Sequence, residues 1–193
     1  MDILLKDGRR VVLRRQEVDD EDRVVTFFDA LARDPDSTFY PMQRAPEELA
    51  KWLRRAGFFS LETNLLWVVE TTSSQMVGHM FVKRQDLPTI GIEGIGQLYL
   101  ALSDDYRRAG LGTQLLSLVK GGLREALKSA GLRRIVGHIL QENRASLQAV
   151  LRAGFHREGL LKEHIRGVDG RYHDVVVVAC LVTSEVDERA VAM

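Results

Sequence analysis

The fold of this chain can be worked out from one segment, SDDYRRAGLGT, at residues 103–113. An aliphatic run from Ile95 to Leu102 precedes it and predicts a buried strand. Apolar side chains then recur every fourth residue, which predicts a helix with one apolar face: Leu115, Val119, Leu123 and Leu127. The segment is therefore a turn that leads from a strand into a helix.

This turn has the chemistry of a phosphate site. Gly110 and Gly112 lack a Cβ, so the backbone can turn tightly and approach a ligand. The N–H groups of the first helical turn and the positive end of the helix dipole point at such a ligand. Arg107 and Arg108 add positive charge beside it. We therefore expect a phosphate ligand here, and a diphosphate above all.

Two common nucleotide motifs do not fit the segment. A nucleoside-triphosphate loop reads G-x-x-x-x-G-K-[ST], and that string does not occur in the sequence. A dinucleotide fingerprint precedes a helix, whereas the glycines of residues 91–96 run into a strand. The pattern Arg107-x-x-Gly110-x-Gly112 instead resembles the acetyl-CoA loop of the GNAT N-acetyltransferases, which reads [QR]-x-x-G-x-[GA].

A second segment supports the same resemblance. Asn143-Arg144-Ala145-Ser146 opens a helix and Gly154-Phe155 closes it, which is similar to the family's N-x-x-[AS] block followed by G-F. Residues 154–159 also look like the G-F-x-x-E-G string of the ribosomal-protein N-terminal and small-molecule amine acetyltransferases. With the flanking strands, the resemblance covers roughly residues 11–182.

The resemblance implies an α/β GNAT fold. Its sheet is mixed and mostly antiparallel, with a splayed parallel central pair and helices on both faces. A bulge in the central strand, residues 92–102, would separate it from its parallel neighbour, and the gap would hold the pantetheine arm. We expect one acetyltransferase domain over residues 1–183 and a polar C-terminal tail over residues 184–193.

Local patterns predict the remaining elements. Asp7-Gly8 is a hairpin turn, and Gly167 to Gly170 is another. Helices are expected from Val18, from Pro46, over residues 111–130 despite Gly121-Gly122, and from Asn143, where Leu147, Val150 and Leu151 would face the core. Strands are expected over residues 3–5, 11–14, 65–70, 76–83, 92–102, 134–140, 155–165 and 172–182.

The resemblance also assigns the cofactor site. Acetyl-CoA would be the co-substrate, bound by the end of the central strand, by the glycine-containing loop and by the start of the later helix. The candidate cofactor-binding residues are Leu100, Ala101, Leu102, Arg107, Arg108, Ala109, Gly110, Leu111, Gly112, Thr113, Asn143 and Ser146.

The catalytic residues are harder to assign. Relatives often carry a Glu base at the position of Gln97 and a Tyr acid at the position of Val150, and neither residue here can move a proton. Glu93, expected on the same strand face as Gln97, is the candidate base, and Ser146 is the candidate to bond the CoA sulfur. Further candidates gather near the last hairpin: Glu163, His164, Tyr172, His173 and Asp174.

Composition and short sequence signals limit the partners, the location and the metal content expected of the protein. The chain has 27 basic and 27 acidic residues, so nothing global favours nucleic acid. A charged N-terminus and the lack of an apolar run of ~20 residues argue against a signal peptide and a membrane span. The single Cys180 suits a reducing compartment, and His79 and His138 lack metal-ligand spacing. We expect a cytoplasmic protein without a metal.

The predicted function is transfer of an acetyl group from acetyl-CoA to a primary amine, which is a small molecule, a protein N-terminus or a lysine. One alternative is a non-catalytic domain that binds and senses acyl-CoA. Another is a nucleotide- or nucleic-acid-binding domain that uses Arg107, Arg108, Arg133 and Arg134. The expected partners are acetyl-CoA and the amine, with a homodimer left open, and neither nucleic acid nor a membrane.

Overall fold

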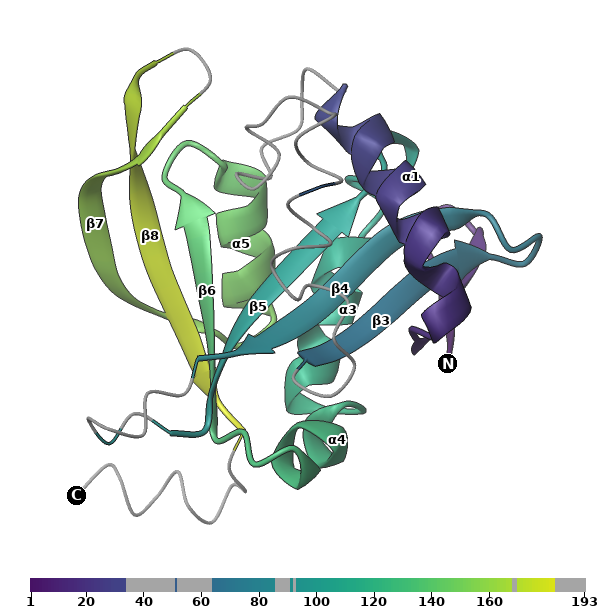
Figure 1. The fold of residues 1–193 in the computed structure, drawn as a ribbon, viewed down its shortest axis with the longest axis horizontal. Coiled ribbons are helices and arrows are strands. Elements are labelled where there is room, and N and C mark those ends of the chain that lie inside the picture. The colour runs from purple at the N-terminus through teal and green to yellow at the C-terminus, as the bar shows by residue number, and fades with distance from the viewer. Residues whose placement is uncertain (34–50, 52–63, 86–90, 92, 168–169, 183–193) are drawn as a thin grey trace.

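A computed structural model describes residues 1–33, 51, 64–85, 91, 93–167 and 170–182. Within these residues, eight strands form one sheet in the order β1-β2-β3-β4-β5-β6-β8-β7 (Figure 1). They are β1 (Asp2–Leu4), β2 (Arg10–Arg15), β3 (Asn64–Thr71), β4 (Met76–Arg84), β5 (Ile95–Leu102), β6 (Arg134–Leu140), β7 (His156–Arg166) and β8 (Tyr172–Leu181). Neighbours pair antiparallel except β5 and β6, which are parallel. The predicted mixed α/β fold is confirmed.

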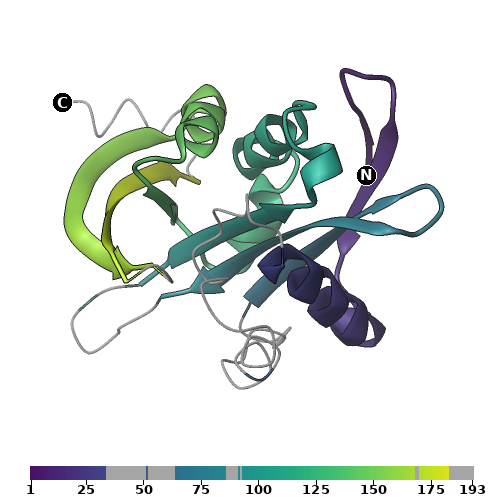
Figure 2. The same ribbon diagram turned by 90° about the horizontal axis from the view of Figure 1, so that it is seen from above.

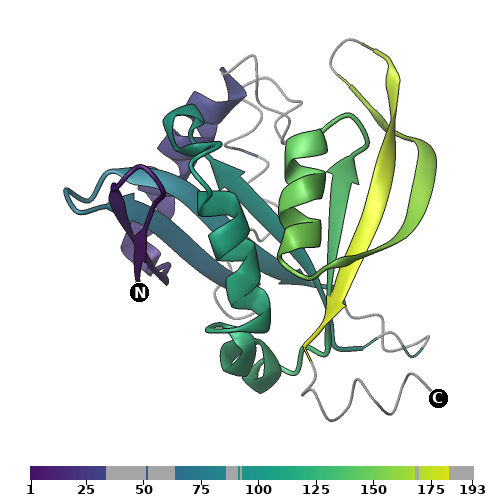
Figure 3. The ribbon, with the colours of Figure 1, turned by 180° about the vertical axis from the view of Figure 1, so that it is seen from behind.

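Helices cover both faces of this sheet (Figure 2). One face carries α1 (Glu21–Ala32), which follows the 3-10 turn η1 (Val18–Asp20). The other face carries α3 (Leu111–Lys120), α4 (Arg124–Ser129) and α5 (Arg144–Arg152), and a second 3-10 turn, η4 (Asp104–Tyr106), precedes α3. Seen from behind, α3 and α5 lie side by side (Figure 3).

Each face has its own apolar core. The face under α1 buries Val24, Phe28 and Phe81. The face under α3, α4 and α5 buries a larger cluster that includes Leu111 and Ile135. This division shows which way each strand residue faces, because side chains alternate along a strand.

The central parallel pair is short. In β5 and β6, both of which are wholly described, three residue pairs are formed, and the last joins Gln97 to Val136. Beyond that point β5 stays paired with β4 as far as Leu102, and β6 stays paired with β8 as far as Leu140. The two strands therefore diverge toward their carboxyl ends (Figure 1). The expected splayed pair is confirmed.

The expected bulge in the central strand is wrong. The register between β4 and β5 runs without a shift from Gly78–Leu102 to Arg84–Gly96. Each strand of the parallel pair follows its outer antiparallel neighbour, so the divergence needs no extra residue in β5.

Two details of the helices also differ from the sequence prediction. The single helix over residues 111–130 is wrong, because Gly121 (φ −114°, ψ −110°) interrupts it between α3 and α4. A Cβ on Gly122 would lie 2.9 Å from Met1 Cε, so the chain bends where the N-terminus packs. Leu151 is 49% exposed rather than in the core, whereas Val150 is buried.

The other expected elements lie within a few residues of the observed ones. The helix predicted from Pro46 and the polar tail lie outside the described residues. Between Gly167 and Gly170 only the flanking residues are described, and the Gly167 N–H donates to the Arg171 carbonyl.

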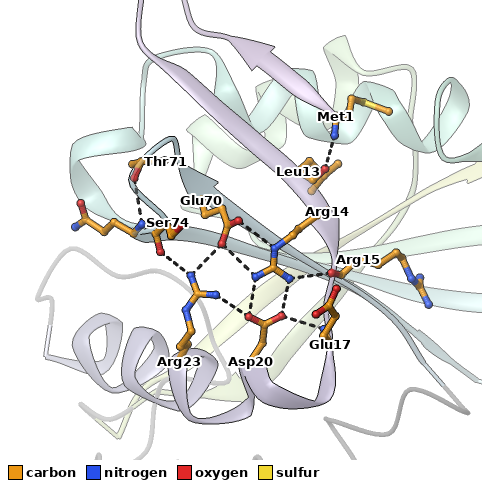
Figure 4. Close-up of polar contacts among 11 residues, drawn as sticks. Met1, Leu13, Arg14, Arg15, Glu17, Asp20, Arg23, Glu70, Thr71 and Ser74 are labelled. Carbon is orange, nitrogen blue, oxygen red and sulfur yellow. Dashed lines mark hydrogen bonds and ion pairs between the residues drawn. The ribbon is translucent and has the colours of Figure 1, made fainter.

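An ion-pair network fixes the start of α1 (Figure 4). The Asp20 side chain is 5% exposed and accepts hydrogen bonds from Arg14 on β2 and Arg23 on α1, each at 2.7 Å. Glu70 on β3 accepts from the same two guanidinium groups, at 3.0 and 2.9 Å. Arg23 also donates to the Ser74 carbonyl. The network joins α1 to two strands and to the turn between β3 and β4.

The network predicts a pH-dependent stability. Hydrogen bonding to Arg14 lowers the pKa of Asp20 to about 2 from an ordinary 3.8. Asp20→Asn should therefore lower the free energy of unfolding by about 2 kcal/mol at pH 7, the scale for hydrogen bonds to a charged group. The difference between the two proteins should persist above pH 4 and shrink as pH falls toward 2, because the native carboxylate is then protonated. Urea unfolding across this pH range measures it.

Buried His79 adds a second pH dependence to that experiment. Burial lowers its pKa to about 3, so both proteins lose stability as pH falls below 6.5. The Asp20 carboxylate raises this pKa, so the loss is larger in Asp20→Asn and adds to the difference between the two proteins below pH 6.5. A difference that stayed constant down to pH 2 would contradict the assigned role of Asp20.

Candidate functional site

The loop before α3 presents backbone donors at the end of β5. Gly110 caps the helix in the left-handed conformation (φ 83°, ψ −5°), and no side chain caps this end. The first bond within the helix runs from the Gln114 N–H to the Gly110 carbonyl. As in every α-helix, the N–H groups of Gly110 through Thr113 have no intrahelical acceptor. They are available to an anion at the positive end of the dipole.

The N-terminal hairpin supports this loop from one side. The Arg9 guanidinium lies 4.2 Å over the Tyr106 ring and donates to the Asp105 carbonyl at 2.8 Å. A Cβ on Gly110 would lie 3.2 Å from Lys6 Cε. Lys6 thus packs its stem on the glycine and brings a further positive charge to the loop. Sequence reasoning missed Lys6, since residues 6 and 110 meet only through the fold.

The two loop arginines differ in their surroundings. Arg107 donates from Nε to the Leu102 carbonyl at 3.1 Å, and its Nη1 lies 3.6 Å from Asp104 Oδ1. Arg107 therefore ties the loop to the last residue of β5. The Arg108 side chain is 85% exposed, and its backbone is left-handed at φ 62°. Of the two, Arg108 is the one whose side chain extends into solvent.

The other predicted cofactor residues line the same region. Leu100 and Leu102 pack toward the α3 face and Ala101 toward the α1 face, all beyond the last pair with β6. Ala109 is partly buried. Leu111 is the first residue of α3, and its side chain is fully buried in the core beneath that helix.

The second predicted segment starts α5 at the end of β6. Asn143 is the N-cap, and its side-chain oxygen accepts from the Ser146 N–H at 3.0 Å. The Ser146 hydroxyl lies on the first turn of the helix. Because α3 follows β5 and α5 follows β6, both helices begin where the two strands have diverged (Figure 3). The predicted cofactor residues are thus gathered around one opening.

A chain of polar side chains crosses the base of that opening. Gln97 is buried, at 5% exposure, and its Nε2 lies 3.0 Å from His138 Nδ1 on β6. The Gln85 amide nitrogen donates to Gln97 Oε1. Leu98 and Ile135 belong to the core under α3, so Gln97 and His138 face the opposite side, toward α1. Sequence reasoning considered His138 only as a metal ligand; a polar residue within an apolar strand was the available signal.

The surroundings of His138 favour the neutral form of its imidazole. It is half-buried, and burial is the main cause that lowers its pKa below 6.5, with repulsion from His164 second. The two rings have centroids 6.4 Å apart. A neutral imidazole can offer one N–H and one lone pair to a reaction.

The two candidate catalytic residues are placed differently. Ser146 lies with the cofactor residues, whereas Glu93 is exposed and precedes β5. The expectation that Glu93 shares a strand face with Gln97 is wrong, because Gly94 (φ 70°) breaks the alternation between them. Glu93 sits at the end where β5 and β6 are still paired, away from their opening.

The residues of the last hairpin surround a hollow of about 820 Å³ beside the end of β6. Tyr172 lines it, and two acids there are paired: Glu142 with His173 at 2.6 Å, and Asp174 with Lys162 at 2.7 Å. Asp174 also accepts from the Glu163 N–H and so holds Glu163 in a left-handed bulge, with φ 47°. His164 lies near His138 instead. The strands therefore bring together four of the five residues of the predicted cluster, all but His164.

The described residues contain neither a cluster of metal ligands nor a membrane-spanning helix. In that part of the chain, no group of three His, Cys, Asp or Glu side chains is arranged to hold a metal ion. None of the helices described is long and apolar enough to cross a membrane.

Comparison with known proteins agrees with the fold. The profile of the acetyltransferase (GNAT) domain matches residues 10–156. No curated protein sequence matches the chain. A GNAT-family acetyltransferase from Streptococcus pneumoniae is 20% identical and has a TM-score of 0.69, with 90% of this chain and 99% of that one covered. Spermidine N-acetyltransferase from Vibrio cholerae, solved with CoA and spermine, is 18% identical, with a TM-score of 0.65 and coverage of 89% and 95%.

The two loop glycines give a matched pair of variants. Gly110→Ala places a side chain at φ 83° and against Lys6, a strain of roughly 1–2 kcal/mol that the loop relieves by moving its N–H groups. We expect roughly tenfold weaker acetyl-CoA binding by calorimetry. At Gly112 a Cβ would lie 3.6 Å from Leu102 Cδ1, an ordinary contact, so Gly112→Ala should bind within about twofold of wild type. A larger loss of acetyl-CoA affinity in Gly112→Ala than in Gly110→Ala would contradict the assignment of this loop as the cofactor site.

Proposed function

The chain belongs to the acetyltransferase (GNAT) family, and from that premise we propose how it binds its substrates and which acceptor it takes. It is an N-acetyltransferase that uses acetyl-CoA as co-substrate and an amine as acceptor. In our proposal the diphosphate lies on the loop before α3, the pantetheine arm lies between β5 and β6, and the amine approaches from the hollow at the last hairpin.

The opening between β5 and β6 is the observation that carries this proposal. Past Gln97 the side of β5 that faces β6 has no ladder partner on it, although both strands are described throughout. Backbone N–H and C=O groups need partners when they are shielded from water. The pantetheine arm contains two amide groups, which can bond strand edges as a neighbouring strand would. Leu100, Ala101 and Leu102 would then contact it from β5.

The phosphate end would be held by charge and by backbone donors together. The N–H groups of Gly110 through Thr113 supply hydrogen bonds of the kind that bind phosphates at helix N-termini. Lys6 and Arg108 supply exposed positive charge on either side of Gly110. Asn143 and Ser146 would bound the thioester end, since they begin α5 across the same opening.

The lining of the hollow supports an acceptor that carries both charges. Its described acids are Glu142, Glu163 and Asp174, and its described bases besides His173 are Arg144 and Lys162. Such a mixed lining suits an amino acid or a peptide N-terminus better than a polycation, which would need an excess of acid. Within the described residues, Glu163 is the acid of this set without an ion pair. We assign Glu163 to the acceptor's ammonium group.

Thioester turnover with a panel of amines tests this function. We expect CoA release with amino acids or short peptides, at a higher kcat/KM than with spermidine. Turnover with spermidine alone would overturn the acceptor class. Tight binding of acetyl-CoA with no turnover of any amine would instead favour an acyl-CoA sensor.

The acceptor site has its own matched variants. Glu163→Gln should raise the KM for the amine by roughly tenfold, because a charge-assisted contact is lost, and leave the KM for acetyl-CoA unchanged. Glu125→Gln removes an acid that is 84% exposed on α4 and should change neither constant. Steady-state kinetics in both substrates measures this. A change in the acetyl-CoA constant alone would place Glu163 at the cofactor instead.

A further inference from the structure

Gln97 and His138 join the two strands where they begin to part. The last parallel pair is Gln97–Val136, and His138 lies two residues further along β6 on the same face. The Gln97–His138 contact of 3.0 Å therefore spans the apex of the opening. A ligand that enters the opening from the α3 side of the sheet and extends toward the α1 side would lie next to these two side chains.

The amides determine where the imidazole carries its proton. Gln97 Oε1 accepts from the Gln85 amide nitrogen, so the nitrogen of Gln97 is the atom that faces His138. An amide nitrogen can only donate, and Nδ1 of His138 must therefore accept. A neutral imidazole with an accepting Nδ1 carries its hydrogen on Nε2. Nε2, the ring nitrogen of His138 that does not contact Gln97, is therefore a hydrogen-bond donor and not an acceptor.

We propose that His138 is a catalytic residue that donates its Nε2–H to the thioester carbonyl oxygen, and that Gln97 and Gln85 are positioning residues that hold this tautomer. The inference rests on the proposed placement of acetyl-CoA between β5 and β6. It assigns to Gln97 a role that needs no carboxylate at its position.

The reaction balances without a proton taken up by His138. The neutral amine nitrogen attacks the carbonyl carbon, and the carbonyl oxygen gains negative charge while it accepts the Nε2–H hydrogen bond. The carbon–sulfur bond then breaks, the carbonyl re-forms, and the thiolate of CoA leaves. The nitrogen loses one proton, which passes to the thiolate or to water. A donor held in place for the oxyanion typically contributes a factor of 10²–10³ in kcat.

The surroundings of His138 agree with a neutral donor. On the described part of the same face, Lys83 is the cross-strand partner of Gln97, and Arg134 is paired with Glu158. A further titratable neighbour is His164 on β7. None of these is a carboxylate bonded to Nδ1, the arrangement that would make Nε2 a base.

Two substitutions of His138 separate a donor from a base. His138→Ala should lower kcat at least 100-fold. His138→Gln places an amide N–H near the position of Nε2 and does not titrate, so it should recover at least tenfold of that loss. It should also keep the pH–rate profile of the wild type. Acetyl-CoA affinity by calorimetry should stay within twofold in both variants, which separates this inference from the binding site itself.

A substitution at Gln97 tests the tautomer. In Gln97→Glu a carboxylate would accept from Nδ1–H, which moves the hydrogen from Nε2 to Nδ1. Nitrogen-15 NMR of the imidazole should show the Nε2–H form in the wild type and the Nδ1–H form in the variant, and kcat should fall. This readout needs no turnover, so it remains decisive if the enzyme proves inert toward every amine offered.

Three results would overturn the inference. One is an Nδ1–H tautomer in the wild type. Another is a His138→Gln variant as slow as His138→Ala that has also lost an ascending limb of the pH profile, which would make His138 a base. The third is a His138→Ala variant whose kcat equals that of the wild type.

Discussion

The early end of the central parallel pair shapes the whole protein. β5 stays paired with β4 and β6 stays paired with β8, while the parallel pair between them ends at Gln97 and Val136. The sheet therefore opens in its own middle, where backbone polar groups would otherwise be paired. A sheet that opens at its centre is well suited to a long, amide-containing ligand.

The helices are arranged around that opening. α3 and α5 start at the two diverging strand ends, and their first turns carry the predicted phosphate loop and the Asn143 cap. On the other face, α1 is fastened by Asp20 to Arg14 and Arg23, and it packs on β3 and β4 (Figure 4). The described elements thus place the loop before α3 and the Asn143 cap on one face of the sheet, and the side chains of Gln97 and His138 on the other.

The sequence predicts the fold well because its signals are local. Apolar runs predict where most strands and helices lie, and Gly110 and Asn143 mark the starts of two of the helices. The failures concern backbone geometry: Gly121 ends a helix that periodicity continues, and Gly94 turns Glu93 away from the face of Gln97. Leu151 shows the same limit, since periodicity alone does not say how wide the buried face of α5 is.

The site is less predictable than the fold, because its polar pairs come from distant residues. Gln97 meets His138 across a sequence separation of 41 residues, and Lys6 meets Gly110 only once the N-terminal hairpin has docked. The motif residues can be found from their spacing, whereas these partners depend on the parallel register of β5 and β6. Parallel strands are joined by a long crossover, so no hairpin turn in the sequence shows their register.

A crystal structure with bound acetyl-CoA tests the central claim most directly. The account predicts the pantetheine arm between β5 and β6, the diphosphate on the N–H groups of Gly110 through Thr113, and the thioester oxygen within hydrogen-bond distance of His138 Nε2. A cofactor bound elsewhere on the sheet, with the opening between β5 and β6 empty, would contradict it.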